Sequence, residues 1–199
     1  MTAWQELQGR HLGRLSNLSS KDVSIVKKPL LSIGMIVKNE IRCLERCLKS
    51  LEPLRQAIPC QLVIADTGST DGTREIAEKY ADVFFDFEWV NDFSAARNAV
   101  LDRCTGKWHL QLDADEWFED CQPFINLMQA PKLNEYQFIL PVLRNYRLLG
   151  NTEQYSDFST ARLFRLGIGI RYSGSIHEVP NYSNKKKNKI GRASCRERV

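Results

Sequence analysis

Short apolar runs alternate with stretches of helical periodicity between residues 30 and 112. Four of the runs have the length and composition of buried strands. They are LLSIGMIV at 30–37, QLVIA at 61–65, VFFDF at 83–87 and KWHLQL at 107–112. Strand and helix patterns that alternate in this way are typical of an α/β fold in which helices cover a parallel sheet in three Rossmann-like layers.

The segments between these strands carry helix signals. Asn39 can cap a helix with Ile41, Leu44, Leu48 and Leu51 on one side, and Pro53 is expected to end it. Ser94 can cap a second helix, which carries small apolar residues. Beyond about residue 130, QFILPVL and ARLFRL read as strands with no long helix between them. The second half is therefore expected to be mixed or antiparallel.

Charge divides the chain into three parts. Residues 1–29 form an N-terminal extension, residues 30–180 form one domain, and residues 181–199 carry seven basic groups and one acid. The other 180 residues hold 21 basic and 23 acidic groups, so the domain is no polyanion-binding surface and nucleic acid is a poor partner. The basic tail is expected to be disordered, because it shows no periodicity or packing pattern, or to be non-native in GRASCRERV, where the chain stops abruptly just after a motif, as in a truncated or mis-joined reading frame. If the tail is native, a second interpretation is that its basic residues bind peripherally to an acidic membrane surface.

Cysteine spacing and hydropathy bear on zinc binding, membrane spans and cellular location. The six cysteines have no zinc-ligand spacing and are interpreted as buried or half-buried thiols. No signal peptide and no apolar run of about 20 residues is found, so no transmembrane segment and a cytoplasmic location are expected.

Polar residues follow three of the predicted strands at the point where each strand ends. Asn39 and Glu40 follow the first strand, Asp66 the second, and Asp113 and Asp115 the fourth. The carboxyl ends of parallel strands meet at one edge of a sheet, where ligands bind in open α/β folds. These side chains are therefore expected to lie around one crevice.

Each candidate also has a purely structural interpretation. Asp66 is either a turn residue or a carboxylate that accepts hydrogen bonds from a nucleobase or ribose, with Gly68 allowing close backbone approach. Asp113 and Asp115 are either an exposed acidic turn or ligands for a hard cation such as Mg²⁺ or Mn²⁺. Arg97 either forms a surface salt bridge or faces a diphosphate.

His177 lies beside Glu178 after a strand-like run. Its structural interpretation is a histidine with no ligand role. Alternatively, a neutral imidazole could complete a metal site begun by Asp115.

Four motifs in order, SIGMIVKNE, ADTGSTDGT, DFSAARNA and LQLDADE, give the domain a family resemblance. It resembles the nucleotide-sugar glycosyltransferases of family 2, which have the GT-A fold, and is most similar to a bacterial subgroup often fused to tetratricopeptide repeats. The resemblance covers residues 30–180. It implies a nucleotide-sugar donor, UDP-linked by preference, and a glycan, lipid or peptide acceptor.

The resemblance also implies roles for the candidate residues. Val37, Asn39, Glu40 and Asp66 would hold the nucleoside, and Arg97 would lie near the nucleotide together with Asn98. Asp113 would contact the ribose or the metal. Asp115 would coordinate Mn²⁺ or Mg²⁺ on the diphosphate, with His177 as a further ligand.

Such enzymes usually invert the anomeric centre, with a carboxylate as the base. The acidic pair that supplies the base in many relatives is not evident in this sequence. Asp157 and Glu178 are the candidates, and Glu116 is less favoured because it adjoins the metal turn.

Two alternatives remain open. One is an inactive or truncated nucleotide-sugar-binding fragment. The other is an aspartate-nucleophile phosphotransferase, because LDADEW resembles a DxDxT loop; that reading needs Thr or Val at position 117, which is Trp.

Overall fold

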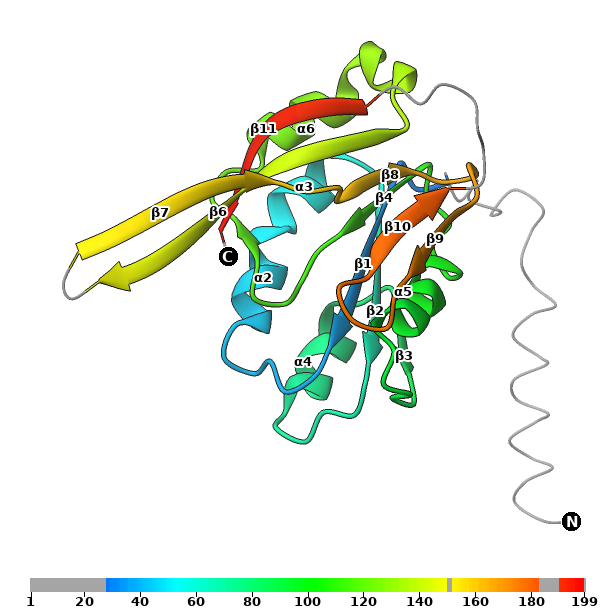
Figure 1. Cartoon of the computed structure of the whole chain (residues 1–199), viewed down its shortest axis with the longest axis vertical. Coiled ribbons are helices and arrows are strands. Elements are labelled where there is room, and N and C mark those ends of the chain that lie inside the picture. The colour runs from blue at the N-terminus through cyan, green and yellow to red at the C-terminus, as the bar shows by residue number, and fades with distance from the viewer. Residues whose placement is uncertain (1–27, 150–151, 183–189, 199) are drawn as a thin grey trace, which may run out of the picture.

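The structure is a computed structural model that describes residues 28–149, 152–182 and 190–198. Most of the predicted N-terminal extension and residues 183–189 of the predicted tail lie outside this range. Figure 1 shows a twisted central sheet with helices packed against it and a long hairpin that extends away from the body.

The four predicted strands form the parallel part of the sheet. They are β1 (Leu31–Val37), β2 (Cys60–Asp66), β3 (Val83–Asp86) and β4 (Trp108–Gln111), in the spatial order β3-β2-β1-β4. The chain moves from β1 to β3 in one direction and then returns to place β4 on the other side of β1. The order of strands therefore reverses between β1 and β4, and this is where ligands bind in open α/β sheets.

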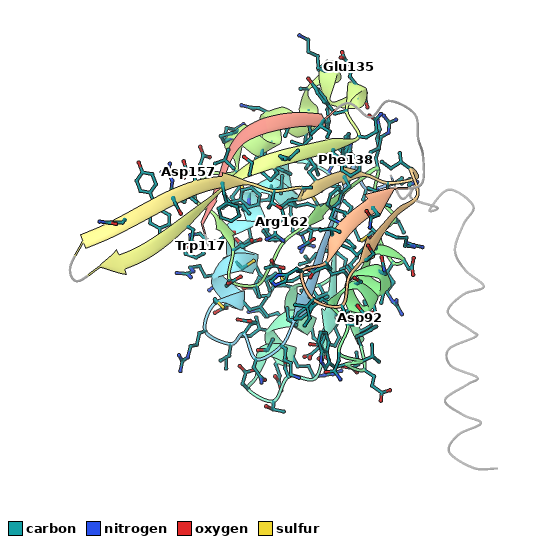
Figure 2. The ribbon with its side chains drawn as sticks, in the orientation of Figure 1. Asp92, Trp117, Glu135, Phe138, Asp157 and Arg162 are labelled. Atoms are coloured by element: carbon teal, nitrogen blue, oxygen red, sulfur yellow. The ribbon has the colours of Figure 1, made fainter. Side chains whose placement is uncertain are left out.

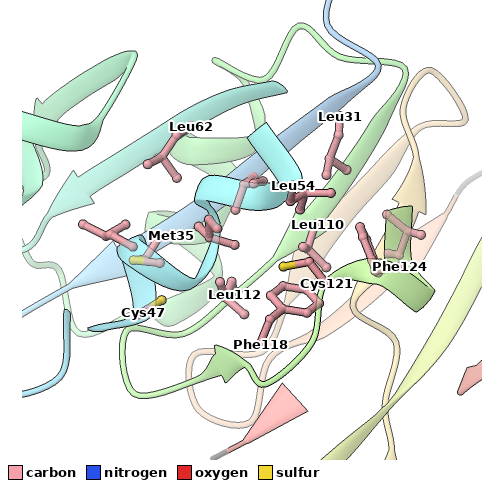
Figure 3. Close-up of a cluster of buried hydrophobic side chains, with 14 of the residues drawn as sticks. Leu31, Met35, Cys47, Leu54, Leu62, Leu110, Leu112, Phe118, Cys121 and Phe124 are labelled. Atoms are coloured by element: carbon pink, nitrogen blue, oxygen red, sulfur yellow. The ribbon is translucent and has the colours of Figure 1, made fainter. Parts of the chain in front are cut away.

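Helices cover both faces of this sheet. They are α2 (Leu44–Ser50), α3 (Glu52–Ala57), α4 (Thr73–Tyr80), α5 (Phe93–Leu101) and α6 (Gln122–Gln129), followed by the 3-10 helix η1 (Pro131–Glu135). Leucine, methionine, cysteine and phenylalanine side chains fill the space between the sheet and the helices α2, α3 and α6, and several of them are labelled in Figure 3. Helix α5 packs on the opposite face, against β1 and β2. The predicted three layers are confirmed.

Three helix signals act differently from the prediction. Pro53 lies in the first turn of α3 and does not end a single long helix, because the first turn tolerates a residue without an N–H. Asp92, not Ser94, caps α5 and accepts a hydrogen bond from the Ala95 N–H. Asn39 does not cap α2, which begins five residues later.

The second half is mixed, as expected. β8 (Leu163–Arg165) pairs antiparallel with both β4 and β6 (Phe138–Leu149), and β7 (Thr152–Ser159) forms the projecting hairpin with β6. β9 (Ile170–Ser173) and β10 (Val179–Tyr182) form a two-stranded sheet beside α5, and β5 (Trp117–Phe118) is short.

The last described segment of the predicted basic tail forms a strand. Residues Ile190–Arg198 form β11, which pairs with β6 in parallel and with β5 antiparallel. Ladder hydrogen bonds use only backbone groups, so a segment without any hydrophobic pattern can still pair with an open strand.

Gly106 lies where the chain enters β4 and contacts the backbone of β1. Its N–H donates to Ser32 Oγ (2.8 Å), and a Cβ at this position would lie 2.7 Å from the Ser32 nitrogen. We expect Gly106→Ala to lower the free energy of unfolding by about 2 kcal/mol, because the obstacle is backbone and cannot rotate away. Urea unfolding measures this loss of free energy. An unchanged midpoint would contradict the prediction, because it would show that the β1 backbone moves aside without loss of stability.

His109 on β4 is a buried neutral histidine. It stacks on Phe164, and its Nδ1 lies 3.4 Å from Cys104 Sγ. Complete burial, with a smaller contribution from the positive charge of Arg97, lowers the pKa of His109 from 6.5 to about 3.

This shift predicts a loss of stability in acid. Below about pH 6.5 the unfolded chain takes up a proton at His109 that the folded protein does not, so the free energy of unfolding falls by up to about 1.4 kcal/mol per pH unit. Urea unfolding at several pH values should show a steeper decline below that pH for the natural protein than for His109→Gln. Equal slopes would mean that the folded protein also protonates this ring.

Candidate functional site

The loops that follow β1 and β2 are tied to each other. The Asn39 N–H donates to Ser69 Oγ (3.0 Å), and the Thr70 N–H donates to Asn39 Oδ1 (2.8 Å). The Glu40 N–H donates to Thr73 Oγ1 (2.7 Å). The Asn39 backbone is in the left-handed region, with φ at 56°. Its side-chain carboxamide therefore stabilises the shape of the loop.

Asp66 ends β2 with a buried side chain. Its Oδ1 accepts from the N–H groups of Gly68 and Ser69, both at 2.7 Å. Its Oδ2 is buried and has no hydrogen-bond partner within the described part of the chain. Gly68 has φ at 103°, and a Cβ there would meet nothing within 4 Å. A buried carboxylate oxygen without a partner costs free energy, and an N–H donor of a ligand would relieve that cost.

Helix α5 brings Arg97 to the edge where β1 and β4 end. The Arg97 side chain is only 10% exposed. Its Nη2 lies 3.0 Å from Asp113 Oδ1, and its Nε donates to Glu178 Oε1. One guanidinium therefore joins two carboxylates, one from the turn after β4 and one from the loop before β10.

Asn98, the next residue, serves another purpose. Its Nδ2 donates to the Tyr172 carbonyl oxygen (3.0 Å), and its Oδ1 accepts from the Tyr172 N–H (2.9 Å). Asn98 thus fastens β9 to α5, and the structure does not bring its side chain to the nucleotide edge as predicted.

A second arginine completes a cluster of charges around Asp113. Arg162 Nη2 lies 3.0 Å from Asp113 Oδ2 and 2.5 Å from Glu116 Oε1. Both oxygens of Asp113 therefore face guanidinium groups. Glu116 is 2% exposed, and its second oxygen accepts from the Asp113 N–H (3.0 Å).

The two carboxyl groups of this cluster respond differently to their surroundings. Burial alone would raise the pKa of Asp113, but Arg162 and Arg97 outweigh it, and the pKa is lowered. Burial raises the pKa of Glu116 from 4.5 to about 7. The positive charge of Arg162 lowers this pKa, and the negative charge of Asp113 raises it further. Asp113 is therefore the stable anion of the cluster.

A cavity of about 500 Å³ opens beside this cluster at the carboxyl ends of the strands. It is bordered by the ends of β1 and β2, by the start of α5 and by the turn after β4. The lining residues are Ile36, Val37, Lys38, Glu40, Thr67, Trp89, Phe93, Arg97, Asp113, Ala114 and Asp115. Asp115 is exposed, so its carboxylate is open to a ligand.

A larger cavity, of about 1230 Å³, lies at the opposite end of the sheet, beside the residues that precede β1 and β4. Its lining contains cations and apolar groups but a single acid, Asp102. The smaller cavity is the candidate site because it has the carboxylates and lies where the strand order reverses.

The structure therefore brings together most of the predicted nucleotide-site residues. Val37, Glu40, Arg97, Asp113 and Asp115 line the cavity, and Asp66 directly precedes the lining residue Thr67. Asn39 and Gly68 shape the adjoining loops.

Besides Asn98, the predicted residues Asp157 and His177 do not line this cavity, and Glu178 is connected to it only through Arg97. Asp157 lies on the β6–β7 hairpin, where Arg144 holds it through two hydrogen bonds of 2.7 and 2.8 Å, and Figure 2 shows it apart from Arg162 near the middle of the domain. His177 is exposed with φ at 57°. Within the described ranges no three His, Cys, Asp or Glu groups lie close enough to hold a metal, so Asp113, Asp115 and His177 do not form a ready three-ligand site.

Sequence reasoning missed Arg162 and the aromatic wall of the cavity. Trp89 and Phe93 both line the cavity, and their rings meet edge to face at 4.8 Å. The sequence did hold a signal for them, because Phe93 belongs to the motif DFSAARNA and Trp89 lies four residues earlier. Arg162 had none, because its partners lie 46 and 49 positions earlier in the chain.

Comparison with known proteins identifies the family. The family model described as "Glycosyl transferase family 2" matches residues 32–180. The chain belongs to glycosyltransferase family 2. It is 31% identical to the SPbeta prophage-derived glycosyltransferase SunS of Bacillus subtilis over 159 residues. This match covers 78% of this chain and 36% of SunS.

The chain is also similar to a second curated protein and to a solved structure. A TPR repeat-containing protein of Synechococcus elongatus is 35% identical over 151 residues, covering 75% of this chain and 35% of that protein. The crystal structure of S. aureus TarS 1–349 in complex with UDP superposes with a TM-score of 0.52 at 21% identity, over 61% of this chain and 38% of that one. The fold is therefore GT-A, as the sequence predicted. The chain spans about a third of the length of these curated relatives.

A search of the described residues for membrane spans finds that none of their helices has the length and apolar character needed to cross a bilayer.

Proposed function

We propose that this protein transfers a sugar from a UDP-linked donor to an acceptor hydroxyl or thiol, with a divalent cation on the donor diphosphate and inversion at the anomeric carbon. The observation that carries the proposal is the cavity at the reversal of strand order, which Arg97 and Asp115 line together with Thr67. Thr67 directly follows Asp66, whose Oδ2 has no hydrogen-bond partner among the described residues. The complex of TarS with UDP supports the choice of nucleotide.

The donor set fits Mn²⁺ or Mg²⁺. These hard cations are usually bound by one or two carboxylates together with phosphate oxygens and water, and not by a closed cage of protein ligands. Asp115 offers such a carboxylate at the cavity, whereas Asp113 has both oxygens engaged by arginines. We therefore assign Asp115 as the ligand. When bound, the cation would neutralise charge on the departing nucleoside diphosphate.

The chain's own groups supply the remaining functions. Asp66 Oδ2 would accept an N–H of the nucleobase, with the backbone at Val37 and Thr67 closing around the nucleoside. Arg97 would add positive charge near the diphosphate while Asp113 keeps its guanidinium in place.

We propose Glu178 as the base, because it contacts Arg97, a residue that lines the cavity. Asp157 contacts Arg144 on the hairpin instead. Glu178 would take the proton of the acceptor hydroxyl or thiol as that group attacks.

A donor screen tests the proposal. The protein is incubated with UDP-, GDP- and other nucleotide sugars and Mn²⁺, and release of nucleoside diphosphate is measured with water as the acceptor. Release from a UDP-sugar supports the proposal. UDP binding without release from any donor would favour the second candidate, a nucleotide-sugar-binding fragment, which the short span relative to the relatives keeps open.

The phosphotransferase alternative has less support. Its nucleophile would be Asp113, and both oxygens of that carboxylate are paired with guanidinium groups. We propose a cytoplasmic setting, because the cysteines are widely spread along the sequence and show no pattern of a disulfide framework.

A further inference from the structure

Residues 113–116 form a closed turn whose ends are tied together. The Glu116 N–H donates to the Asp113 carbonyl oxygen (3.1 Å), and Glu116 Oε2 accepts from the Asp113 N–H (3.0 Å). Asp115 lies inside this turn and is exposed at the cavity. The direction of its carboxylate therefore depends on how firmly the two ends of the turn are held.

Arg162 contacts both ends of the turn from the segment just before β8. The same nitrogen, Nη2, lies 3.0 Å from Asp113 Oδ2 and 2.5 Å from Glu116 Oε1. The Arg162 carbonyl oxygen also accepts from the Gln111 N–H (2.8 Å), which ties its backbone to the end of β4. The side chain is 13% exposed, so little water competes with these contacts.

We infer that Arg162 is a positioning residue that fixes the 113–116 turn so that Asp115 faces the cation and diphosphate in the cavity. This inference rests on the proposed function. Arg162 does not line the cavity, so it acts through the carboxylates of Asp113 and Glu116.

Charge explains why this position requires a cation. Asp113 and Glu116 are adjacent carboxyl groups, and both are largely buried. Without Arg162 they would lose the cation that both contact, which loosens the turn. A lysine ammonium is a point charge and lacks the planar fork of guanidinium, so it replaces the charge but not the geometry.

The test measures UDP binding by calorimetry across a series of Mn²⁺ concentrations, using the natural protein, Arg162→Gln and Arg162→Lys. Arg165→Gln is the matched control, because Arg165 lies on the adjoining strand β8 and its contact with the Asn134 carbonyl oxygen is at the opposite end of the sheet.

We expect Arg162→Gln to raise the Mn²⁺ concentration for half-maximal stimulation of UDP binding by about tenfold to a hundredfold, the usual range for groups that orient a metal ligand. UDP affinity without metal should change less than about twofold, and Arg162→Lys should recover part of the loss. Arg165→Gln should match the natural protein.

Different failures have different meanings. If the natural protein shows no metal-stimulated UDP binding, the proposed function fails. If it does, and Arg162→Gln lowers only the unfolding temperature while the Mn²⁺ dependence stays unchanged, Arg162 is structural and the inference is wrong. If Arg162→Gln does not fold, the same Mn²⁺ series on Arg162→Lys decides between these outcomes.

Discussion

Replacing Asp115 with asparagine is expected to remove the stimulation of UDP binding by Mn²⁺ and to lower donor turnover about a hundredfold or more. A cation contributes several kcal/mol to stabilising a departing diphosphate, and tenfold in rate corresponds to about 1.4 kcal/mol. Asp115 is exposed on a turn, so the unfolding temperature should stay unchanged. Calorimetry with and without Mn²⁺ and release of UDP measure the two effects.

Asp157→Asn is the matched control for that experiment. Asp157 pairs with Arg144 on the hairpin and does not line the cavity, so turnover should remain within about twofold of the natural value. Retained Mn²⁺ stimulation in Asp115→Asn would remove Asp115 from the metal site. Loss of turnover in Asp157→Asn would instead restore the hairpin carboxylate as a candidate base.

Arg97→Gln is expected to weaken both the fold and donor binding. The guanidinium joins Asp113 and Glu178, and its removal takes the cation away from the largely buried Glu178 and leaves Asp113 with Arg162 alone. Breaking such pairs costs about 3 to 5 kcal/mol, so the free energy of unfolding should fall by about 3 kcal/mol. UDP affinity should fall at least about tenfold, because a buried charge beside the diphosphate is lost.

Arg103→Gln is the control for Arg97→Gln. It shows whether the expected effects are specific to Arg97 or follow from the loss of any arginine near α5. Arg103 is exposed and lies over the Phe85 ring, with its centroid 3.8 Å away. Its replacement should lower stability by less than about 1 kcal/mol and leave UDP affinity unchanged. Urea unfolding and calorimetry below the unfolding temperature compare the two variants. An Arg97→Gln protein as stable as Arg103→Gln would contradict the bridging role.

The acidic residues of the site could be predicted from the sequence because they directly follow apolar strands. Apolar strands followed by acids located Asp66, Asp113 and Asp115 at one edge of the sheet, because parallel strands share the direction of their carboxyl ends. The same reasoning predicted the parallel strands and the mixed second half. These features depend on local patterns, which a single sequence displays.

Contacts between distant segments explain what the sequence could not predict. Asn98 looked like a nucleotide ligand beside Arg97, but its amide meets the Tyr172 backbone, 74 positions away. Arg162 belongs to a strand-like run in the sequence, and only the fold brings it against Asp113. Pro53 predicts the end of a helix, although a second helix that begins there gives the same local signal.

Calorimetric titration of the natural protein with UDP, in Mn²⁺ and again in EDTA, most directly tests whether the crevice between β1 and β4 binds a cation-bound pyrophosphate. The account predicts saturable binding in Mn²⁺ that weakens at least about tenfold in EDTA and is blocked by UDP-sugar. Equal affinity in both conditions, or no binding in either, would contradict it.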